Sequence, residues 1–241
     1  MKKTLFTLMA LICTMSINAQ IVKIYRGDQL IISHKVLNGD KVVFEKAPDL
    51  GIKGKTERTG GIEVNWVQLW EGGPRFAEYN VGAENNKAED CGGLYCWGMT
   101  ADKGTSGAYK DGESDLIGYD DTATNLWGEG WRMPTKEEFD NLLAKCDVKW
   151  IDGSTEKYNN TTVTGLLCTG NDAYSSNSVF LPAAGRCDFG YVNDQGNFGY
   201  YWSSTHSGSD LAYYLYFNSG LQGVSDDIRE LGYSVRAVLK E

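Results

Sequence analysis

The chain has 241 residues and a formal net charge of −9 at neutral pH, with 32 Asp and Glu against 23 Lys and Arg. An acidic surface repels phosphate backbones, so this composition argues against a nucleic-acid partner. The length accommodates one large domain, or one domain with a small appendage.

Residues 1–19 have the pattern of a secretory signal peptide. Lys2 and Lys3 precede an apolar run, and Ala19 supplies a small residue at the cleavage point. We therefore expect cleavage near Ala19 and an exported protein, either secreted or held at the cell surface or in the periplasm. Loss of the two lysines changes the net charge from −9 to −11. The apolar run is too short to span a bilayer, and no later segment is longer, so no transmembrane segment is expected.

Residues 20–46 predict a small β-hairpin unit. Apolar and polar residues alternate over 21–25, 30–32 and 42–44, and Asn38-Gly39 suits a tight turn because both residues tolerate positive φ. Such a unit is too small to bury a core of its own. We expect it to pack on the main domain or to dock another surface subunit through residues 21–46.

The next segment, 47–61, is charged and rich in Gly, which predicts a linker or exposed loop. The main domain is then expected over 62–241. It begins with an alternating strand at 62–70, and a second strand is expected to return over 76–81.

Two helices are predicted in the main domain. Thr135 and Glu138 have the spacing of a capping box, in which each side chain bonds the other residue's backbone amide. A shorter helix is expected over 121–127, ended by Gly128. The residues that follow Thr135 at helical spacing on one apolar face are Phe139, Leu142, Leu143 and Cys146.

After cleavage five cysteines remain, and their spacing matches no zinc motif. An exported location permits disulfides, so Cys91–Cys96 and Cys146–Cys168 are hypotheses, with free buried cysteines as the alternative. Asp120-Asp121 and Asp226-Asp227 offer oxygen ligands for calcium, but no recognised calcium loop surrounds them, so solvated turns are favoured. No metal and no cofactor are expected.

Several sequence blocks, read in order, resemble a known family. The blocks are Asn80-Val81-Gly82-Ala83, Tyr95-Cys96-Trp97-Gly98, Trp131-Arg132-Met133-Pro134-Thr135, Val179-Phe180-Leu181-Pro182, Gly199-Tyr200-Tyr201-Trp202 and Gly232-Tyr233-Ser234-Val235-Arg236. Together they resemble the Fibrobacter succinogenes major paralogous domain, a branch of the C-type lectin-like fold related to the formylglycine-generating-enzyme type. The resemblance covers roughly residues 62–238. It implies an α+β fold with small twisted antiparallel sheets, two short helices and long loops, in which the N- and C-terminal strands lie side by side.

The C-terminal layout also resembles the variable lectin-like proteins that retroelements diversify. By that resemblance, Trp202, Leu215, Phe217, Val235 and Val238 are expected to form the scaffold. The positions expected to be exposed and to contact a ligand are Tyr201, His206, Asp210, Tyr213, Tyr214, Tyr216, Asn218, Gln222, Asp226, Asp227 and Arg229. Tyr, Ser, Gly and Asn dominate this region, as they do in surfaces that recognise other molecules.

These features lead to a hypothesis of an exported, non-catalytic binding module that recognises a glycan or protein ligand. The alternative is a structural or adhesive component of a surface assembly, including a retroelement-diversified variable protein. An enzyme is disfavoured because no Gly-x-Ser-x-Gly elbow surrounds Ser203 or Ser204 near His206. The cysteine pair that the related oxidases use near the C-terminus is also missing after Cys187. Arg132 and Arg236 are expected to be partly buried and bonded to loop carbonyls.

Overall fold

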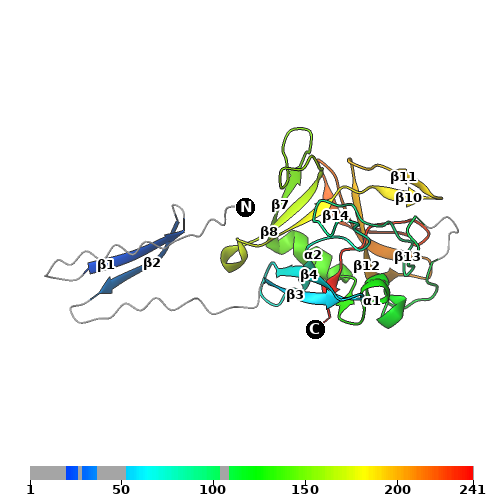
Figure 1. Ribbon diagram of the computed structural model, residues 1–241, viewed down its shortest axis with the longest axis horizontal. Coiled ribbons are helices and arrows are strands. Elements are labelled where there is room, and N and C mark those ends of the chain that lie inside the picture. The colour runs from blue at the N-terminus through cyan, green and yellow to red at the C-terminus, as the bar shows by residue number, and fades with distance from the viewer. Residues whose placement is uncertain (1–19, 27–28, 37–52, 104–108, 241) are drawn as a thin grey trace. The chain divides into compact units, whose positions relative to one another are not determined.

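The computed structural model describes residues 20–26, 29–36, 53–103 and 109–240 (Figure 1). The chain divides into two compact units, residues 1–49 and 50–241. In the first unit, β1 (Gln20–Arg26) and β2 (Gln29–Val36) pair as an antiparallel hairpin, as their alternation predicts. The expected strand at 42–44 lies outside the described residues.

The second unit consists of small antiparallel sheets and two helices (Figure 1), an arrangement compatible with the α+β class. Its largest sheet has five strands in the order β3-β4-β5-β15-β6. These strands are β3 (Lys53–Arg58), β4 (Ile62–Gln68), β5 (Arg75–Ala77), β15 (Val238–Leu239) and β6 (Trp131–Arg132). Val238 pairs with Phe76 on one side and Arg132 on the other, so the last described strand lies beside one of the first strands of the unit, as expected.

Strand β3 corrects the expectation of a linker or exposed loop over 47–61. It pairs with β4 along its whole length, from Lys53 opposite Val67 to Arg58 opposite Ile62. Its side chains alternate between exposed and half-buried, so β3 is a charged edge strand. Charged residues are common on edge strands because they discourage pairing with other chains. A charged edge strand therefore resembles a linker in its composition.

Three further sheets complete the unit. One contains β7 (Cys146–Ile151), β8 (Gly165–Gly170) and β9 (Ser178–Pro182), and a two-stranded sheet contains β10 (Arg186–Asp188) and β11 (Tyr191–Asn193). The third contains β12 (Gly199–Ser207), β13 (Leu211–Phe217) and β14 (Gln222–Ile228), with β13 in the centre. The register between β12 and β13 shifts between Trp202 and His206, where β12 carries extra residues.

Both predicted helices form. In α2 (Lys136–Lys145) the Thr135 hydroxyl accepts from the Glu138 amide, and the Glu138 carboxylate accepts from the Thr135 amide, which completes the capping box. Phe139 and Leu142 are buried, as expected of the apolar face. Helix α1 (Thr122–Trp127) begins after Asp121, whose side chain accepts from the Thr124 amide, and ends at Gly128 with a positive φ. Two short 3-10 helices cover Gly118–Asp120 and Asp172–Tyr174.

The core forms two main clusters, and β12 and β13 contribute to both. Trp202 and Ala212 belong to the cluster that contains Trp97 and Trp131, whereas Leu215 and Phe217 belong to the cluster that contains α2. The β12–β14 sheet is therefore covered on both faces over much of its area. All five scaffold residues expected from the resemblance are fully buried, which confirms that part of the prediction: Trp202, Leu215, Phe217, Val235 and Val238.

Arg236 joins distant segments inside the core and is fully buried. It donates to Asn80 Oδ1 (2.9 Å), the carbonyls of Ala77 (3.0 Å) and Glu78 (2.7 Å), and the carbonyl of Phe180 (2.9 Å). This confirms the expectation of a structural arginine that satisfies carbonyls.

The two disulfide hypotheses are wrong in this structure, because all five described cysteines are free thiols. Cys146 and Cys168 lie on neighbouring strands, but Cys146 is opposite Gly170 and Cys168 is opposite Val148. Four of the five are buried and behave as small apolar side chains. Among the described residues, no helix is long and apolar enough to cross a membrane.

Candidate functional site

Tyr201, expected to be exposed, is fully buried. Its hydroxyl donates to the Pro182 carbonyl (2.8 Å) and accepts from Asn80 Nδ2 (3.1 Å), and its ring stacks against Phe217. It lies on the sheet face that packs in the α2 cluster, so it belongs to the scaffold. The expectation that Tyr201 is exposed is therefore wrong.

Arg229 is also fully buried, which corrects its expected place among the ligand contacts. Its guanidinium lies 4.1 Å from the centroid of the Trp97 ring and donates to four backbone carbonyls. These are the carbonyls of Lys110, Gly112, Gly208 and Leu211. Because its donors are occupied within the protein, Arg229 holds loops together rather than facing a ligand.

The other predicted contacts do not form one surface. Tyr213 pairs with Asp226, and both lie on the sheet face directed to α2, where Lys136 Nζ is 5.3 Å from the Tyr213 ring centroid. Tyr214 and Tyr216 lie on the opposite face because successive strand residues point to opposite sides.

Of the five remaining contacts, Asp227 lies within β14 opposite Ala212, and the other four lie near strand ends. His206 lies beyond the register shift, with Nδ1 2.7 Å from Asp115 Oδ1. Asp210 precedes β13, and its carbonyl accepts from the Arg229 amide. Asn218 and Gln222 flank the turn between β13 and β14.

The face that carries Tyr214 and Tyr216 holds a group of rings that we call the tyrosine cluster: Tyr200, Tyr214, Tyr216 and Tyr233. Tyr214 links them, with ring centroids 6.0 Å from Tyr200, 6.1 Å from Tyr216 and 5.0 Å from Tyr233. Tyr233 is buried and its hydroxyl donates to Asp227 (2.7 Å), whereas the other three are half-buried. Burial raises the pKa of Tyr214 to about 12, with a further contribution from the Asp227 carboxylate. The Tyr214 hydroxyl therefore stays protonated at neutral pH.

A glycine makes room for the outer ring of this cluster. Gly223 on β14 lies directly opposite Tyr216, and a Cβ at Gly223 would lie 2.9 Å from the Tyr216 hydroxyl. The tyrosine side chain thus extends across β14, supported by the strand beneath it. This pairing has no signal in the sequence, because Gly223 is informative only once its cross-strand neighbour is known.

Charged and aromatic groups outside the predicted set adjoin the cluster. Arg186 Cζ lies 5.9 Å from the Tyr200 ring centroid, and Arg186 Nε is 3.7 Å from the Asp194 carboxylate. The Phe198 ring stacks on the Tyr200 ring, with the two centroids 5.8 Å apart and an interplanar angle of 13°. Cationic, anionic and aromatic groups are therefore all available at this surface.

Phe198 also lines a groove, which we call the Trp150 groove. It encloses about 600 Å³. Its lining residues come from three parts of the chain: Trp150, Asp152 and Thr164, then 196–198, and then 218–221. Asn218, from the predicted set, lies in this groove rather than on the face that carries Tyr214.

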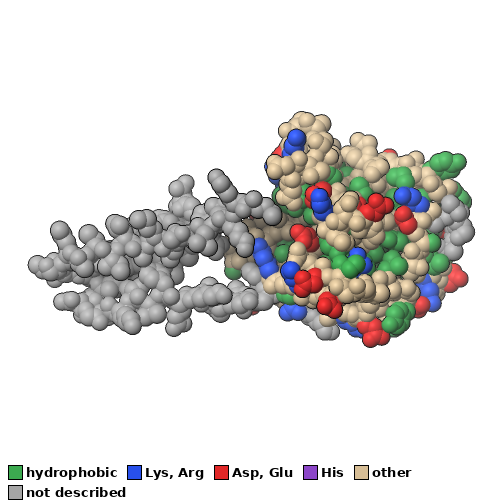
Figure 2. All heavy atoms as spheres, in the orientation of Figure 1, with side chains coloured by type: hydrophobic (Ala, Val, Ile, Leu, Met, Phe, Trp, Pro, Cys, Tyr) green, Lys and Arg blue, Asp and Glu red, His purple; other side chains and the backbone are tan. Residues whose placement is uncertain are grey.

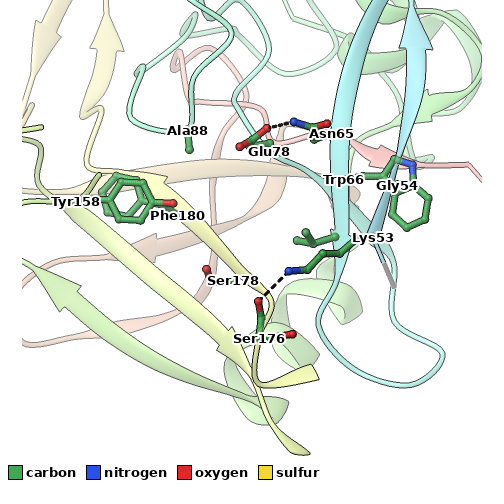
Figure 3. Close-up of a pocket in the computed structure, with 11 residues that line it drawn as sticks. Lys53, Gly54, Asn65, Trp66, Glu78, Ala88, Tyr158, Ser176, Ser178 and Phe180 are labelled. Carbon is green, nitrogen blue, oxygen red and sulfur yellow. Dashed lines mark hydrogen bonds between the residues drawn. The ribbon is translucent and has the colours of Figure 1, made fainter. Parts of the chain in front are cut away.

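A second recess, shown in Figure 3, contains none of the predicted contacts. It encloses about 360 Å³ between β3–β4 and the stacked rings of Tyr158 and Phe180. Lys53 Nζ already donates to the Ser176 carbonyl (2.9 Å), and Asn65 Nδ2 donates to Glu78 Oε2 (2.6 Å). These bonds use polar groups at both ends of the recess, so it offers fewer free partners to a ligand.

The molecular face in Figure 2 shows basic and acidic side chains interspersed, with small apolar areas between them. This face has no broad field of one sign of the kind that attracts a polyanion.

The serines near His206 do not form a catalytic arrangement with it. Ser203 Oγ donates to the Tyr213 carbonyl (2.8 Å), and Ser204 is buried against the Pro134 carbonyl. Within the described ranges, no group of three or more His, Cys, Asp or Glu side chains is arranged to hold a metal ion.

Residues 146–238 match the model of one family, described as a domain of unknown function (DUF8237). The matched range contains β7 to β14 and therefore both the tyrosine cluster and the Trp150 groove. No curated protein and no solved structure matches the chain.

Proposed function

We propose that the chain is an exported, non-catalytic binding module with a C-type lectin-like domain, and that it recognises a glycan or protein ligand through the tyrosine cluster. The observation that carries this proposal is the packing of Tyr214 between Tyr200, Tyr216 and Tyr233 on a sheet anchored in the core. Rings held in this way lose little conformational entropy on binding, which is why tyrosine is favoured in recognition surfaces.

The C-type lectin-like assignment is supported by the position of β15 between β5 and β6 and by the two helices and long loops of the unit. An experimental structure that superposes on a C-type lectin-like domain tests it. Export is supported by the pattern of residues 1–19. Mass spectrometry of the protein from its natural host should find a mature chain that begins at Gln20.

The binding proposal is tested with variants on opposite faces of one sheet. Tyr216→Ala removes an outer ring, and Tyr214→Phe removes a hydroxyl while keeping its ring contacts. Tyr213→Ala is the matched control, because Tyr213 lies on the same strand but on the opposite face.

Glycan arrays and capture of surface proteins should detect a ligand whose binding weakens in Tyr216→Ala and Tyr214→Phe but not in Tyr213→Ala. Circular dichroism spectra should match the wild type in all three. No ligand in either screen would refute the proposal, as would equal loss of binding in the control.

A second function, as a structural or adhesive component of a surface assembly, is favoured by one observation. Strands β1 and β2 belong to a compact unit separate from residues 50–241. Under this proposal, deletion of residues 20–49 abolishes assembly while the remaining unit stays folded. A deletion variant that still assembles excludes the docking role of the hairpin.

A further inference from the structure

We propose that the Trp150 groove binds a neutral oligosaccharide. This inference rests on the proposed binding function, and it names a ligand class for the groove that Phe198 lines beside the tyrosine cluster. It follows from the charge of the groove, its unused hydrogen-bonding groups and its aromatic walls.

The charge of the groove excludes most anionic ligands. Among its described lining residues there is no Lys or Arg, and the one ionisable side chain is Asp152. Hydrogen bonds from the Ser154 hydroxyl (2.7 Å) and amide (2.9 Å) to Asp152 Oδ1 lower the pKa of this carboxyl, so it is ionised at neutral pH. A phosphate, sulfate or uronate group would meet a carboxylate here and no cation to offset it.

The groove keeps several hydrogen-bonding groups unused. Asn218 Oδ1 accepts from the amides of Gly220 (2.8 Å) and Leu221 (2.9 Å), which fixes the side chain, while no described residue accepts from its Nδ2. The Asn197 side chain and the Trp150 Nε1 likewise have no partner within the described part of the chain. These groups and the second oxygen of Asp152 offer both donors and acceptors, as a ligand rich in hydroxyls requires.

Aromatic rings provide the apolar walls of the groove. Trp150 is half-buried and held at its edge by Phe217, with ring centroids 6.3 Å apart. Phe198, also half-buried, is fixed by its stacking on Tyr200. A pyranose ring has an apolar face of C–H groups and an edge of hydroxyls, so it fits a site that combines rigid rings with planar amides.

The space and position of the groove agree with this ligand. About 600 Å³ exceeds two other recesses in the described part of the chain, which enclose about 360 and 230 Å³. Three loops on a rigid sheet framework form it, and loops positioned in this way are where binding residues concentrate. The loop after β7, which contributes Asp152, is prominent at the top of Figure 1.

The experiment is calorimetric and fluorescence titration of the full mature chain with short gluco-, manno- and xylo-oligosaccharides, and with polygalacturonate as an anionic arm. Trp150→Phe keeps an aromatic ring against Phe217 but removes the indole N–H, and Asn197→Ala removes an exposed amide that has no bond within the described protein. The matched controls are Trp66→Phe, which changes the other half-buried tryptophan, and Asn193→Ala on β11.

We expect at least one neutral oligosaccharide to bind and to change the tryptophan fluorescence. Affinity should fall by about tenfold or more in Trp150→Phe and Asn197→Ala, equivalent to about 1.4 kcal/mol, and should be unchanged in the controls. The fluorescence change should be lost in Trp150→Phe.

Tighter binding of polygalacturonate than of every neutral oligosaccharide overturns the proposal. So does oligosaccharide binding that survives both groove variants but is lost in Tyr216→Ala, which would assign the sugar to the tyrosine cluster. If no oligosaccharide binds while a protein ligand is captured through the tyrosine cluster, the groove proposal fails and the proposed function stands.

Discussion

Replacement of Arg236 by methionine should destabilise the protein strongly. The substitution keeps an apolar stem of similar length but leaves four acceptors without their donor. Three are buried, namely Asn80 Oδ1 and the carbonyls of Ala77 and Phe180, and the Glu78 carbonyl is partly buried. An unsatisfied buried acceptor costs about 1–3 kcal/mol. Since carbonyls can keep a second hydrogen bond, we take the lower value for each and expect a loss of about 4 kcal/mol. That is a large part of a typical folding free energy of about 5–15 kcal/mol.

The assay is urea unfolding followed by tryptophan fluorescence, which reports on the core because Trp97, Trp131 and Trp202 are fully buried. With a slope of roughly 2 kcal/mol per M, the transition midpoint should fall by about 2 M. Arg58→Met is the matched control, because the Arg58 side chain makes one long hydrogen bond to Asn86 (3.3 Å) and a cation–π contact with Trp127. A midpoint shift below about 0.5 M in Arg236→Met would refute the assigned role of this network.

Three further predictions concern packing, tyrosine ionisation and thiols. Gly165→Ala should cost about 1–3 kcal/mol, because its Cβ would lie 2.3 Å from the Leu181 carbonyl oxygen, whereas Gly130→Ala, with its nearest contact at 4.0 Å, should be tolerated; equal thermal stability of the two variants contradicts this. Burial raises the pKa of Tyr95 and of Tyr214 to about 12, so between pH 10 and 12 the unfolded chain loses protons that the folded chain keeps. The free energy of unfolding should therefore not depend on these two groups below pH 10, and it should fall as the pH rises above 10. Tyrosinate absorbance that rises near pH 10 for every tyrosine of the folded protein speaks against this. Of the five described cysteines, only Cys91 is half-buried rather than buried. With a thiol reagent at mildly alkaline pH, at most one of these five thiols should therefore react before unfolding, and all five should react in urea. Rapid labelling of several of them in the native protein is the contrary result.

Local signals predicted the helices correctly. The capping box at Thr135 and Glu138 is complete within four residues, and Asp121 and Gly128 mark the two ends of α1. Cap interactions are made by neighbours in sequence, so no knowledge of tertiary structure is needed to recognise them.

The directions of side chains on β12–β14 could be predicted only in part. Tyr213 and Tyr214 were both expected to contact a ligand, but successive strand residues point to opposite faces. Because tyrosines occur on both faces of this sheet, the sequence does not say which face is covered. Tyr201 was misassigned for this reason. At the register shift after Trp202, residues 203–205 of β12 lie opposite the single residue Tyr213, and an irregularity of this kind has no clear sequence signal here.

Most of the candidate surface depends on contacts between distant segments. Trp150 and Asn218 meet in one groove although β8 to β13 separate them in the chain. Arg186 reaches Tyr200 from β10, and Arg229 reaches carbonyls near residue 110. Nothing in the spacing of a single sequence links such pairs, so this surface became visible only with the fold.

The pairing of β15 also affects how the domain matures. Val238 pairs with Phe76, which lies 162 positions earlier in the chain. This sheet therefore cannot be completed until Val238 has been synthesised. Under the proposed export, the polypeptide passes through a narrow translocation channel, and late closure of this sheet would keep the emerging chain unfolded enough to pass until nearly all of it has been produced. Truncation before Val238 should therefore leave the strands β5 and β6 without the element that connects them, and such products would be readily digested by proteases.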